Sequence, residues 1–275
     1  MHSASHGRAV CSDGLELSLV AGKKCDALSY YGVMDYRSRI YQHYVRARSR
    51  PLAPERLEGL SPLAPYTRKV IREHFPMDRS ARILDLGCGH GAFIYFLREA
   101  GYTNVVGVDK SPEQVAEAKR LGIEGVHEAD LWETLQQSAD ASYDVVITFD
   151  VIEHFSKEEL LPLVDEVQRI LRSGGRWVIH TPNGESPFVG RIRYGDVTHE
   201  MAFTRMSISQ LLQSSGFVKV VCREDTPVPH GIKSAVRWIL WKMIRSGLRF
   251  YIAAETGAAE SECIFSQNFL VIAVK

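Results

Sequence analysis

The segment at residues 83–93, ILDLGCGHGAF, constrains the fold of this chain more than any other. A short apolar run of strand character leads into a turn with glycine at three alternate positions, and an amphipathic stretch of helical period follows. Glycine has no Cβ atom to keep a ligand off the backbone, so the turn predicts a ligand at main-chain N–H groups and at the positive end of a helix. Asp85 precedes the glycines, and Asp109 ends the next apolar run. Two carboxylates favour a ligand with ribose hydroxyls and a positive charge over one dominated by phosphate.

Downstream of residue 81 the chain alternates between strand-like and helix-like segments, which predicts a doubly wound α/β fold, a parallel sheet with helices on both faces. Ser156 and Glu159 form a capping-box pattern at the start of one helix, and Gly174 with Gly175 is expected to stop it. After the opening strand we expect strands at residues 104–109, 125–128, 143–149, 176–180, 217–222 and 264–274, and helices at residues 66–75, 92–100, 111–121, 156–172 and 207–215.

Polar side chains gather where the predicted strands end. Ligands of parallel sheets bind at the carboxyl ends of the strands. The residues at or just beyond these ends, which we expect to converge on one edge, are Asp85, Asp109, Asp130, Asp150 and Thr181.

The composition excludes several classes of protein. The chain has 33 basic and 33 acidic residues, and this zero net charge argues against a nucleic-acid partner. Its five cysteines are scattered, with no C-x-x-C pair, which argues against a disulfide framework and fits a reducing cytoplasm. We expect no signal peptide and no membrane-spanning segment, and therefore a cytoplasmic protein.

Four motifs together carry a family resemblance: DLGCGHG at residues 85–91, the acidic strand end at Asp109, ADL at residues 129–131 and FDVIEH at residues 149–154. In this order they resemble the motifs of class I S-adenosylmethionine-dependent methyltransferases over roughly residues 81–222. The resemblance implies a Rossmann-like, mostly parallel seven-stranded sheet with S-adenosyl-L-methionine as the cofactor. A dinucleotide dehydrogenase is the alternative, but it would bring a pyrophosphate to this loop, and Asp85 would repel it.

The same resemblance implies which residues bind the cofactor. Asp85 would lie near the ammonium group, and Asp109 would accept both ribose hydroxyls. The glycine turn would lie against the methionine part, with the adenine beside Asp130 and Leu131. The full predicted set is Asp85, Gly87, Cys88, Gly89, Gly91, Asp109, Lys110, Asp130, Leu131, Phe149 and Asp150, with Tyr41 from outside the motifs.

Methyl transfer to a hydroxyl usually needs a base or a metal, because a hydroxyl is a weak nucleophile at neutral pH. Asp150, Glu153 and His154 are similar to an acid-x-x-Glu-His arrangement that can bind a divalent metal in ubiquinone-biosynthesis O-methyltransferases. The alternative is that Glu153 and His154 only fix the loop at a helix entry.

A second candidate for the catalytic base lies in the loop at residues 181–206. This loop resembles the acceptor loop of methyltransferases from bacterial polysaccharide and small-molecule pathways, where a histidine lies near the acceptor. We expect His199 to be the general base, oriented by Asp196 or Glu200, with His154 as a further catalytic candidate. A structural role for His199 as a brace of the loop is the alternative.

The chain is expected to divide into an arm with lid-like helices at residues 1–75 and the methyltransferase domain at residues 76–275. Within the arm, residues 30–50 are aromatic and basic with a helical period. Aromatic faces suit a sulfonium cation, so this run could be a lid in which Tyr41 and Tyr44 meet the cofactor. Simple packing of these tyrosines on the sheet is the alternative.

A basic amphipathic helix is predicted at residues 232–253, inserted before the last strand. At about 100° per residue its bases share one half of the helix and apolar residues fill the other. It could be an internal helix, a dimer element, or an interfacial helix that holds the protein at the inner face of an anionic membrane. The bases are Lys233, Arg237, Lys242, Arg245 and Arg249.

Taken together, these features predict O-methylation of a hydroxyl on a small-molecule, glycan or lipid-linked acceptor. N- or C-methylation is the enzymatic alternative. A non-catalytic, methyltransferase-like binding subunit is the other, although such a subunit need not keep an intact cofactor set.

Overall fold

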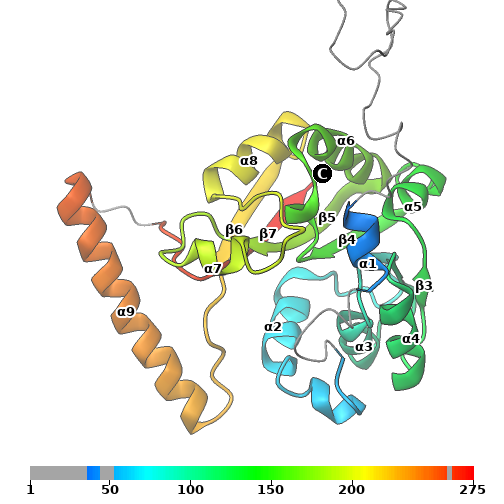
Figure 1. The fold of residues 1–275 in the computed structure, drawn as a ribbon, viewed down its shortest axis with the longest axis horizontal. Helices are drawn as coiled ribbons and strands as arrows, with labels where there is room; N and C mark the ends of the chain where they lie inside the picture. Colours follow the sequence, from blue (N-terminus) through cyan, green and yellow to red (C-terminus); the bar gives the residue numbers. More distant parts are fainter. Residues whose placement is uncertain (1–35, 44–52, 259–261) are drawn as a thin grey trace, which may run out of the picture. The chain divides into compact units, whose positions relative to one another are not determined.

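The computed structural model describes residues 36–43, 53–258 and 262–275 (Figure 1). The chain divides into a unit at residues 1–36 and a second at residues 37–275, and the description below concerns the second. Most of the predicted arm, with Tyr44 of the proposed lid, lies outside the described residues. Of the helix expected at residues 30–50, the structure describes α1 (Tyr36–Tyr41).

Seven strands form one sheet in the part of the chain that the structure describes (Figure 1). Their order is β3-β2-β1-β4-β5-β7-β6, and only β7 runs antiparallel to its neighbours. This confirms the predicted α/β fold and its mostly parallel, seven-stranded sheet. The strands are β1 (Ile83–Leu86), β2 (Val105–Asp109), β3 (Val126–Glu128), β4 (Tyr143–Phe149), β5 (Leu171–Pro182), β6 (Lys219–Glu224) and β7 (Asn268–Val274).

Helices cover both faces of the sheet, as the continuous apolar strands require. Ile83 of β1 packs with residues of α2, α3 and α4 on one face. Its neighbour Leu84 points to the other face and packs with residues of α5, α6 and α8. The helices are α2 (Ala64–His74), α3 (Ala92–Glu99), α4 (Pro112–Leu121), α5 (Leu131–Gln137), α6 (Lys157–Ile170), α7 (Val189–Arg193), α8 (Arg205–Ser214) and α9 (Ile232–Thr256), with 3-10 turns η2 (Leu57–Leu60) and η3 (Ile152–His154).

The capping box of α6 is confirmed, but the predicted stop of this helix is wrong. The Ser156 backbone N–H donates to Glu159 Oε2 at 2.8 Å, which closes the box. The helix ends at Ile170, because Leu171 already pairs with Tyr143 as part of β5. Gly174 and Gly175 therefore lie within β5, and β5 begins five residues before the predicted start at residue 176.

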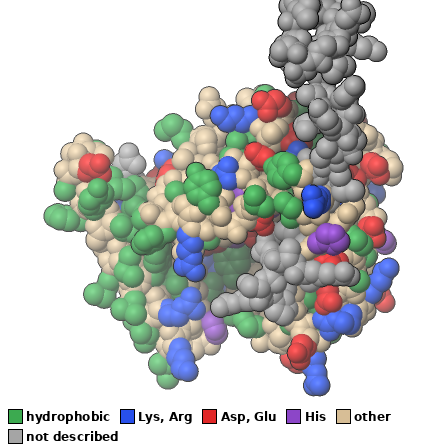
Figure 2. All heavy atoms as spheres, in the orientation of Figure 1, with side chains coloured by type: hydrophobic (Ala, Val, Ile, Leu, Met, Phe, Trp, Pro, Cys, Tyr) green, Lys and Arg blue, Asp and Glu red, His purple; other side chains and the backbone are tan. Residues whose placement is uncertain are grey.

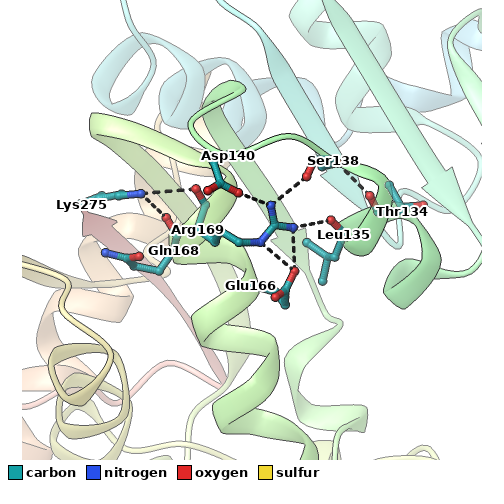
Figure 3. Close-up of polar contacts among 8 residues, drawn as sticks. All are labelled: Thr134, Leu135, Ser138, Asp140, Glu166, Gln168, Arg169 and Lys275. Atoms are coloured by element: carbon teal, nitrogen blue, oxygen red, sulfur yellow. Dashed lines mark hydrogen bonds and ion pairs between the residues drawn. The ribbon is translucent and has the colours of Figure 1, made fainter.

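The short helix α5 was not predicted from the sequence. It begins where the Asp130 carboxylate accepts the Trp132 backbone N–H at 2.8 Å, as an N-cap. Its other end is held from α6, because Arg169 donates to the Leu135 and Ser138 carbonyl oxygens, both at 2.8 Å (Figure 3). The same guanidinium pairs with Glu166 and Asp140. Arg169 thus satisfies carbonyl groups that a helix end leaves without partners.

We predict that Arg169→Met lowers the free energy of unfolding by about 1–3 kcal/mol, because two carbonyl oxygens and two carboxylates lose their donor. Urea unfolding measures this. The matched control is Arg68→Met, which removes an exposed pair with Glu99 and should cost much less stability. Equal losses in the two variants would contradict a special role for Arg169.

Candidate functional site

The glycine turn joins β1 to α3 and is held against β2. The backbone N–H groups of Gly87 and Cys88 both donate to the Val108 carbonyl, at 2.8 and 3.0 Å. Gly87, at φ +70°, and Gly91, at φ +80°, adopt the left-handed backbone that L side chains rarely take. A Cβ atom on Gly91 would lie 2.7 Å from Val126 Cγ2. The turn therefore needs glycine for its own packing, and it leaves main-chain N–H groups near the start of α3.

Asp109, at the end of β2, connects this turn to α4. Its Oδ2 accepts the Gly89 N–H and its Oδ1 accepts the Ser111 N–H, both at 2.8 Å. Burial raises the pKa of Asp109, although these two hydrogen bonds oppose the shift. The structure thus brings together the turn and the second acidic motif, as the sequence predicts.

Asp85 is buried in β1, with 2% of its surface exposed. Burial raises the pKa of Asp85 well above its usual range, and the charge of Asp109 adds to the shift. A ligand ammonium group beside these carboxylates would reverse that shift, because an opposite charge favours the ionised form. The pair therefore fits a cofactor that carries positive charge.

Lys110 and Asp130 form the side of the site where the resemblance puts the adenine. The Lys110 ammonium lies 3.1 Å from Asp130 Oδ2, and Asp130 caps α5, whose first residue is Leu131. The pair links the loops after β2 and β3. Their contact with adenine stays a prediction.

Asp150, directly after β4, belongs to a chain of polar groups that sequence reasoning missed. It has φ +55°, and its Oδ1 lies 2.7 Å from Nδ1 of His180 at the end of β5. The other ring nitrogen, Nε2, lies 2.6 Å from Asp225 Oδ2, and the Tyr66 hydroxyl donates to Asp225. His180 also stacks on Phe149, with 5.0 Å between ring centroids. The sequence feature that could have indicated His180 as a site residue is its position at the end of a predicted strand.

This chain of groups is charged. Burial alone would lower the pKa of His180, but carboxylates on both ring nitrogens raise it well above its usual range. Desolvation by its neighbours would raise the pKa of Asp150, whose side chain is 56% exposed, but the charge of His180 holds this pKa below its usual range. An imidazolium between two carboxylates leaves a net negative charge at this edge of the sheet.

A second cluster holds the predicted catalytic and metal-binding histidines. Glu153, His154 and His199 each offer a ligand atom, and these atoms lie within 4.8 Å of one another. Backbone bonds create this juxtaposition, because the N–H groups of Glu200 and Met201 both donate to the Glu153 carbonyl. The two candidate sites of the sequence are therefore one site.

Hydrogen bonds orient both histidines of the cluster. His154 Nδ1 lies 2.9 Å from the Thr198 hydroxyl, which donates to Asp196 at 2.6 Å. His199 Nδ1 lies 3.0 Å from the Ile192 carbonyl, so that its N–H donates there. Asp196 thus accepts from Thr198 and does not orient His199, which is oriented by the backbone carbonyl of Ile192. In each ring Nε2 is left with a lone pair.

Burial sets the charge of this cluster. It lowers the pKa of His154 to about 4, with help from the charge of His199, and it lowers the pKa of His199 as well. Both imidazoles are therefore neutral at neutral pH. Burial also raises the pKa of Glu153, which is fully buried, and its Oε1 has no hydrogen-bond partner among the described residues.

The donor set of this cluster fits a divalent metal. A carboxyl oxygen without a partner, which a bound cation would hold in the ionised form, and two neutral imidazoles, each with its second nitrogen hydrogen-bonded, are typical of transition-metal sites. The grouping differs from the predicted Asp150, Glu153 and His154 set, since His199 joins the other two while Asp150 bonds to His180.

Helix α1 lies over this cluster. Arg37 donates to the His154 carbonyl at 2.9 Å and forms a two-bond pair with Glu159 of α6. Tyr41 packs edge-on against His154, with 6.2 Å between ring centroids. Burial raises the pKa of Tyr41, and the charges of Asp196 and Asp109 add to this shift. Contact with the cofactor itself stays a prediction.

Residues 41–222 match the methyltransferase-domain family. The chain belongs to the class I S-adenosylmethionine-dependent methyltransferases. S-adenosyl-L-methionine is accordingly its methyl donor. The likeness to solved structures concerns the fold: a methyltransferase from Archaeoglobus fulgidus superposes with a TM-score of 0.59 at 20% identity, over 88% of this chain and 100% of that one.

Relatives with different acceptors match this methyltransferase. A ubiquinone biosynthesis O-methyltransferase from Azorhizobium caulinodans is 33% identical over 129 residues, 43% of this chain and 46% of the relative. A lysine methyltransferase from Mus musculus is also 33% identical, over 121 residues, 38% of this chain and 46% of the relative. The chain thus spans about half the length of these curated relatives, and their acceptors differ in the atom that is methylated.

We predict that Asp109→Asn weakens binding of S-adenosylhomocysteine by tenfold or more, because hydrogen bonds from ribose hydroxyls to a charged acceptor contribute about 1.5–3 kcal/mol each. Isothermal titration calorimetry measures the affinity. Asp165→Asn, at an exposed position on α6, is the matched control and should bind as the wild type does. Unchanged affinity of a folded Asp109→Asn variant would remove the ribose assignment.

Proposed function

We propose that this methyltransferase methylates a hydroxyl group on a small-molecule, glycan or lipid-linked acceptor. The observation that carries the proposal is the cluster of Glu153, His154 and His199, which offers neutral imidazoles beside the sheet edge where the cofactor motifs end. A hydroxyl needs such help, whereas a neutral amine carries a reactive lone pair already. The ubiquinone-pathway relative supports the same class of acceptor.

In this mechanism the acceptor oxygen attacks the methyl carbon in line with the carbon–sulfur bond. The oxygen–methyl bond forms, the carbon–sulfur bond breaks, and the sulfonium becomes the neutral thioether of S-adenosylhomocysteine. His199 Nε2 takes the hydroxyl proton. The Ile192 carbonyl on Nδ1 fixes the ring. The positive charge of the imidazolium would in turn favour the ionised form of Glu153, whose Oε1 lies 4.0 Å from Nε2. Much of the rate would still come from positioning.

The same three residues would hold a divalent metal, which would supply Lewis-acid activation of the acceptor hydroxyl. His154 and His199 would then bind it through Nε2, with Glu153 as the anionic ligand. In this version His199 is a ligand, and the proton leaves the hydroxyl by another route. Only the second version requires a bound metal, so a measurement of metal binding distinguishes the two.

N- or C-methylation is the second candidate, and the likeness to a lysine methyltransferase favours methylation of nitrogen. It would make the His199 cluster dispensable for chemistry. A non-catalytic binding subunit is less well supported, because the chain keeps the glycine turn together with Asp85 and Asp109 in one arrangement.

We predict that His199→Ala lowers the rate of methyl transfer by about 10²–10⁴-fold, the usual contribution of general acid–base catalysis. A screen of hydroxyl acceptors with labelled S-adenosylmethionine identifies the substrate, and single-turnover rates then measure the effect. The control is His74→Asn, which changes a histidine outside the cluster. His74 is the last residue of α2, and its backbone carbonyl, which the variant keeps, accepts from Arg176 of β5. A wild-type rate for His199→Ala would remove the proposed base and favour N-methylation.

Metal binding is tested without activity. If the cluster is a metal site, titration with Mn²⁺ should show one bound ion per chain by electron paramagnetic resonance, and Glu153→Gln should weaken binding at least tenfold. His74→Asn should bind as the wild type does. If no Mn²⁺ binds and His199→Ala is slow, the metal version is excluded and the base mechanism is the one that stands.

A further inference from the structure

Helix α9 exposes a large apolar surface. Only Ser234 of its 25 residues is buried, whereas Ile232 is 85% exposed and Phe250 is 77% exposed. At about 100° per residue the large exposed apolar side chains, Trp238 excepted, share one arc of roughly 140°. Figure 2 shows hydrophobic side chains along this helix. The members of this apolar arc are Ile232, Val236, Ile239, Leu240, Met243, Ile244, Phe250 and Tyr251.

The opposite side of α9 is fixed to the protein. Arg245 donates to Glu224 of β6 at 2.8 Å and to the Cys263 carbonyl at 3.0 Å. Its guanidinium also lies over the Phe265 ring. These contacts set the rotation of the helix about its axis, so that the apolar arc points away from the sheet. They also correct the sequence hypothesis, because Arg245 pairs with Glu224 and leaves four bases for a partner.

Those four bases lie on both borders of the apolar arc. By helical position Lys233 and Arg237 lie along one border, and Lys242 and Arg249 along the other. The first acidic residue of the helix is Glu255, in its last turn. The Lys242 ammonium lies 5.1 Å from the centroid of the Trp238 ring. Apolar residues bordered by long basic side chains are typical of helices that lie in a membrane surface.

The charge of α9 decides between possible occupants of its apolar arc. In a symmetric dimer each copy presents the same surface, so bases would face bases with no acidic residue of the arc between them. Anionic lipid head groups supply the missing charge. None of the helices among the described residues is long and apolar enough to cross a bilayer. An orientation parallel to the surface is the one that buries the arc.

We propose that α9 is an interfacial helix that docks this protein on anionic phospholipid bilayers, with the apolar arc in the lipid and Lys233, Arg237, Lys242 and Arg249 at the phosphate level. The first turns of α9 also border a cavity of about 270 Å³, lined by Tyr66, Asp225 and Arg237 among others. Tyr66 and Asp225 belong to the polar chain that reaches Asp150. Docking through α9 would thus hold this side of the methyltransferase domain close to the lipid.

The test is co-sedimentation of the full chain with vesicles of phosphatidylcholine alone or with equal parts of phosphatidylglycerol. The wild type should sediment with the anionic vesicles and much less with the neutral ones, and added salt should release it. Met243→Glu should lower the affinity at least tenfold. Met77→Glu makes the same change at an exposed methionine before β1, and should bind as the wild type does.

Replacement of bases tests the electrostatic part. The double variant Lys233→Gln/Lys242→Gln should lose roughly fivefold in affinity for each base removed, whereas Lys69→Gln on α2 should lose nothing. Three outcomes would overturn the proposal: no sedimentation of the wild type with anionic vesicles, equal binding of Met243→Glu and Met77→Glu, or a dimer that Met243→Glu dissociates in the absence of lipid. Far-ultraviolet circular dichroism confirms that each variant is folded.

Discussion

The carboxylate of Asp109 joins the elements on which the cofactor site depends. It accepts one N–H from the glycine turn and one from the residue before α4, and so fixes the ends of β1 and β2 relative to each other. The turn can come this close because Gly87 and Gly91 have left-handed backbones and no Cβ atoms. The Asp109 side chain therefore holds the glycine turn against the sheet at the place where we predict that the ribose binds.

Most of the fold follows from sequence patterns that act over short distances. Continuous apolar strands, glycine turns and the box of Ser156 and Glu159 specify their own local structures, and the family resemblance implies the mostly parallel, seven-stranded sheet. The helix stop at Gly174 and Gly175 was misjudged because pairing of Leu171 with Tyr143 extends β5 toward α6. Long-range pairing overrode a local signal there. Helix α5 was missed because it is short and rests on a cap and on Arg169.

The candidate site divides in the same way. The cofactor motifs are contiguous in sequence, so their residues could be named in advance. The chain from Asp150 through His180 to Asp225 could not, because Asp225 follows β6 and arrives only when β6 and β7 pair. Likewise His154 and His199 were separate candidates in the sequence. They become one cluster through backbone bonds to the Glu153 carbonyl, and no pattern of side chains encodes those bonds.

The two sides of the site differ in charge. On the cofactor side, carboxylates outnumber their basic partners, and on the acceptor side burial keeps two imidazoles neutral. Helix α1 packs on the second of these, because Tyr41 lies edge-on against His154 and Arg37 donates to the His154 carbonyl. A cationic donor and a neutral acceptor are the pair of reactants that such a division suits.

The raised pKa of Asp85 has a consequence for how the cofactor enters. In the free protein, burial and the neighbouring charge of Asp109 favour a proton on this carboxyl group. In the contact that we predict, the ammonium group of the cofactor would favour the ionised form of Asp85 instead, so that association and proton release would be linked equilibria. Proton and cofactor then compete for the same carboxylate, and the apparent affinity for the cofactor rises with pH over the range in which Asp85 titrates. In this linkage, binding of the cofactor releases the proton that Asp85 carries in the free protein.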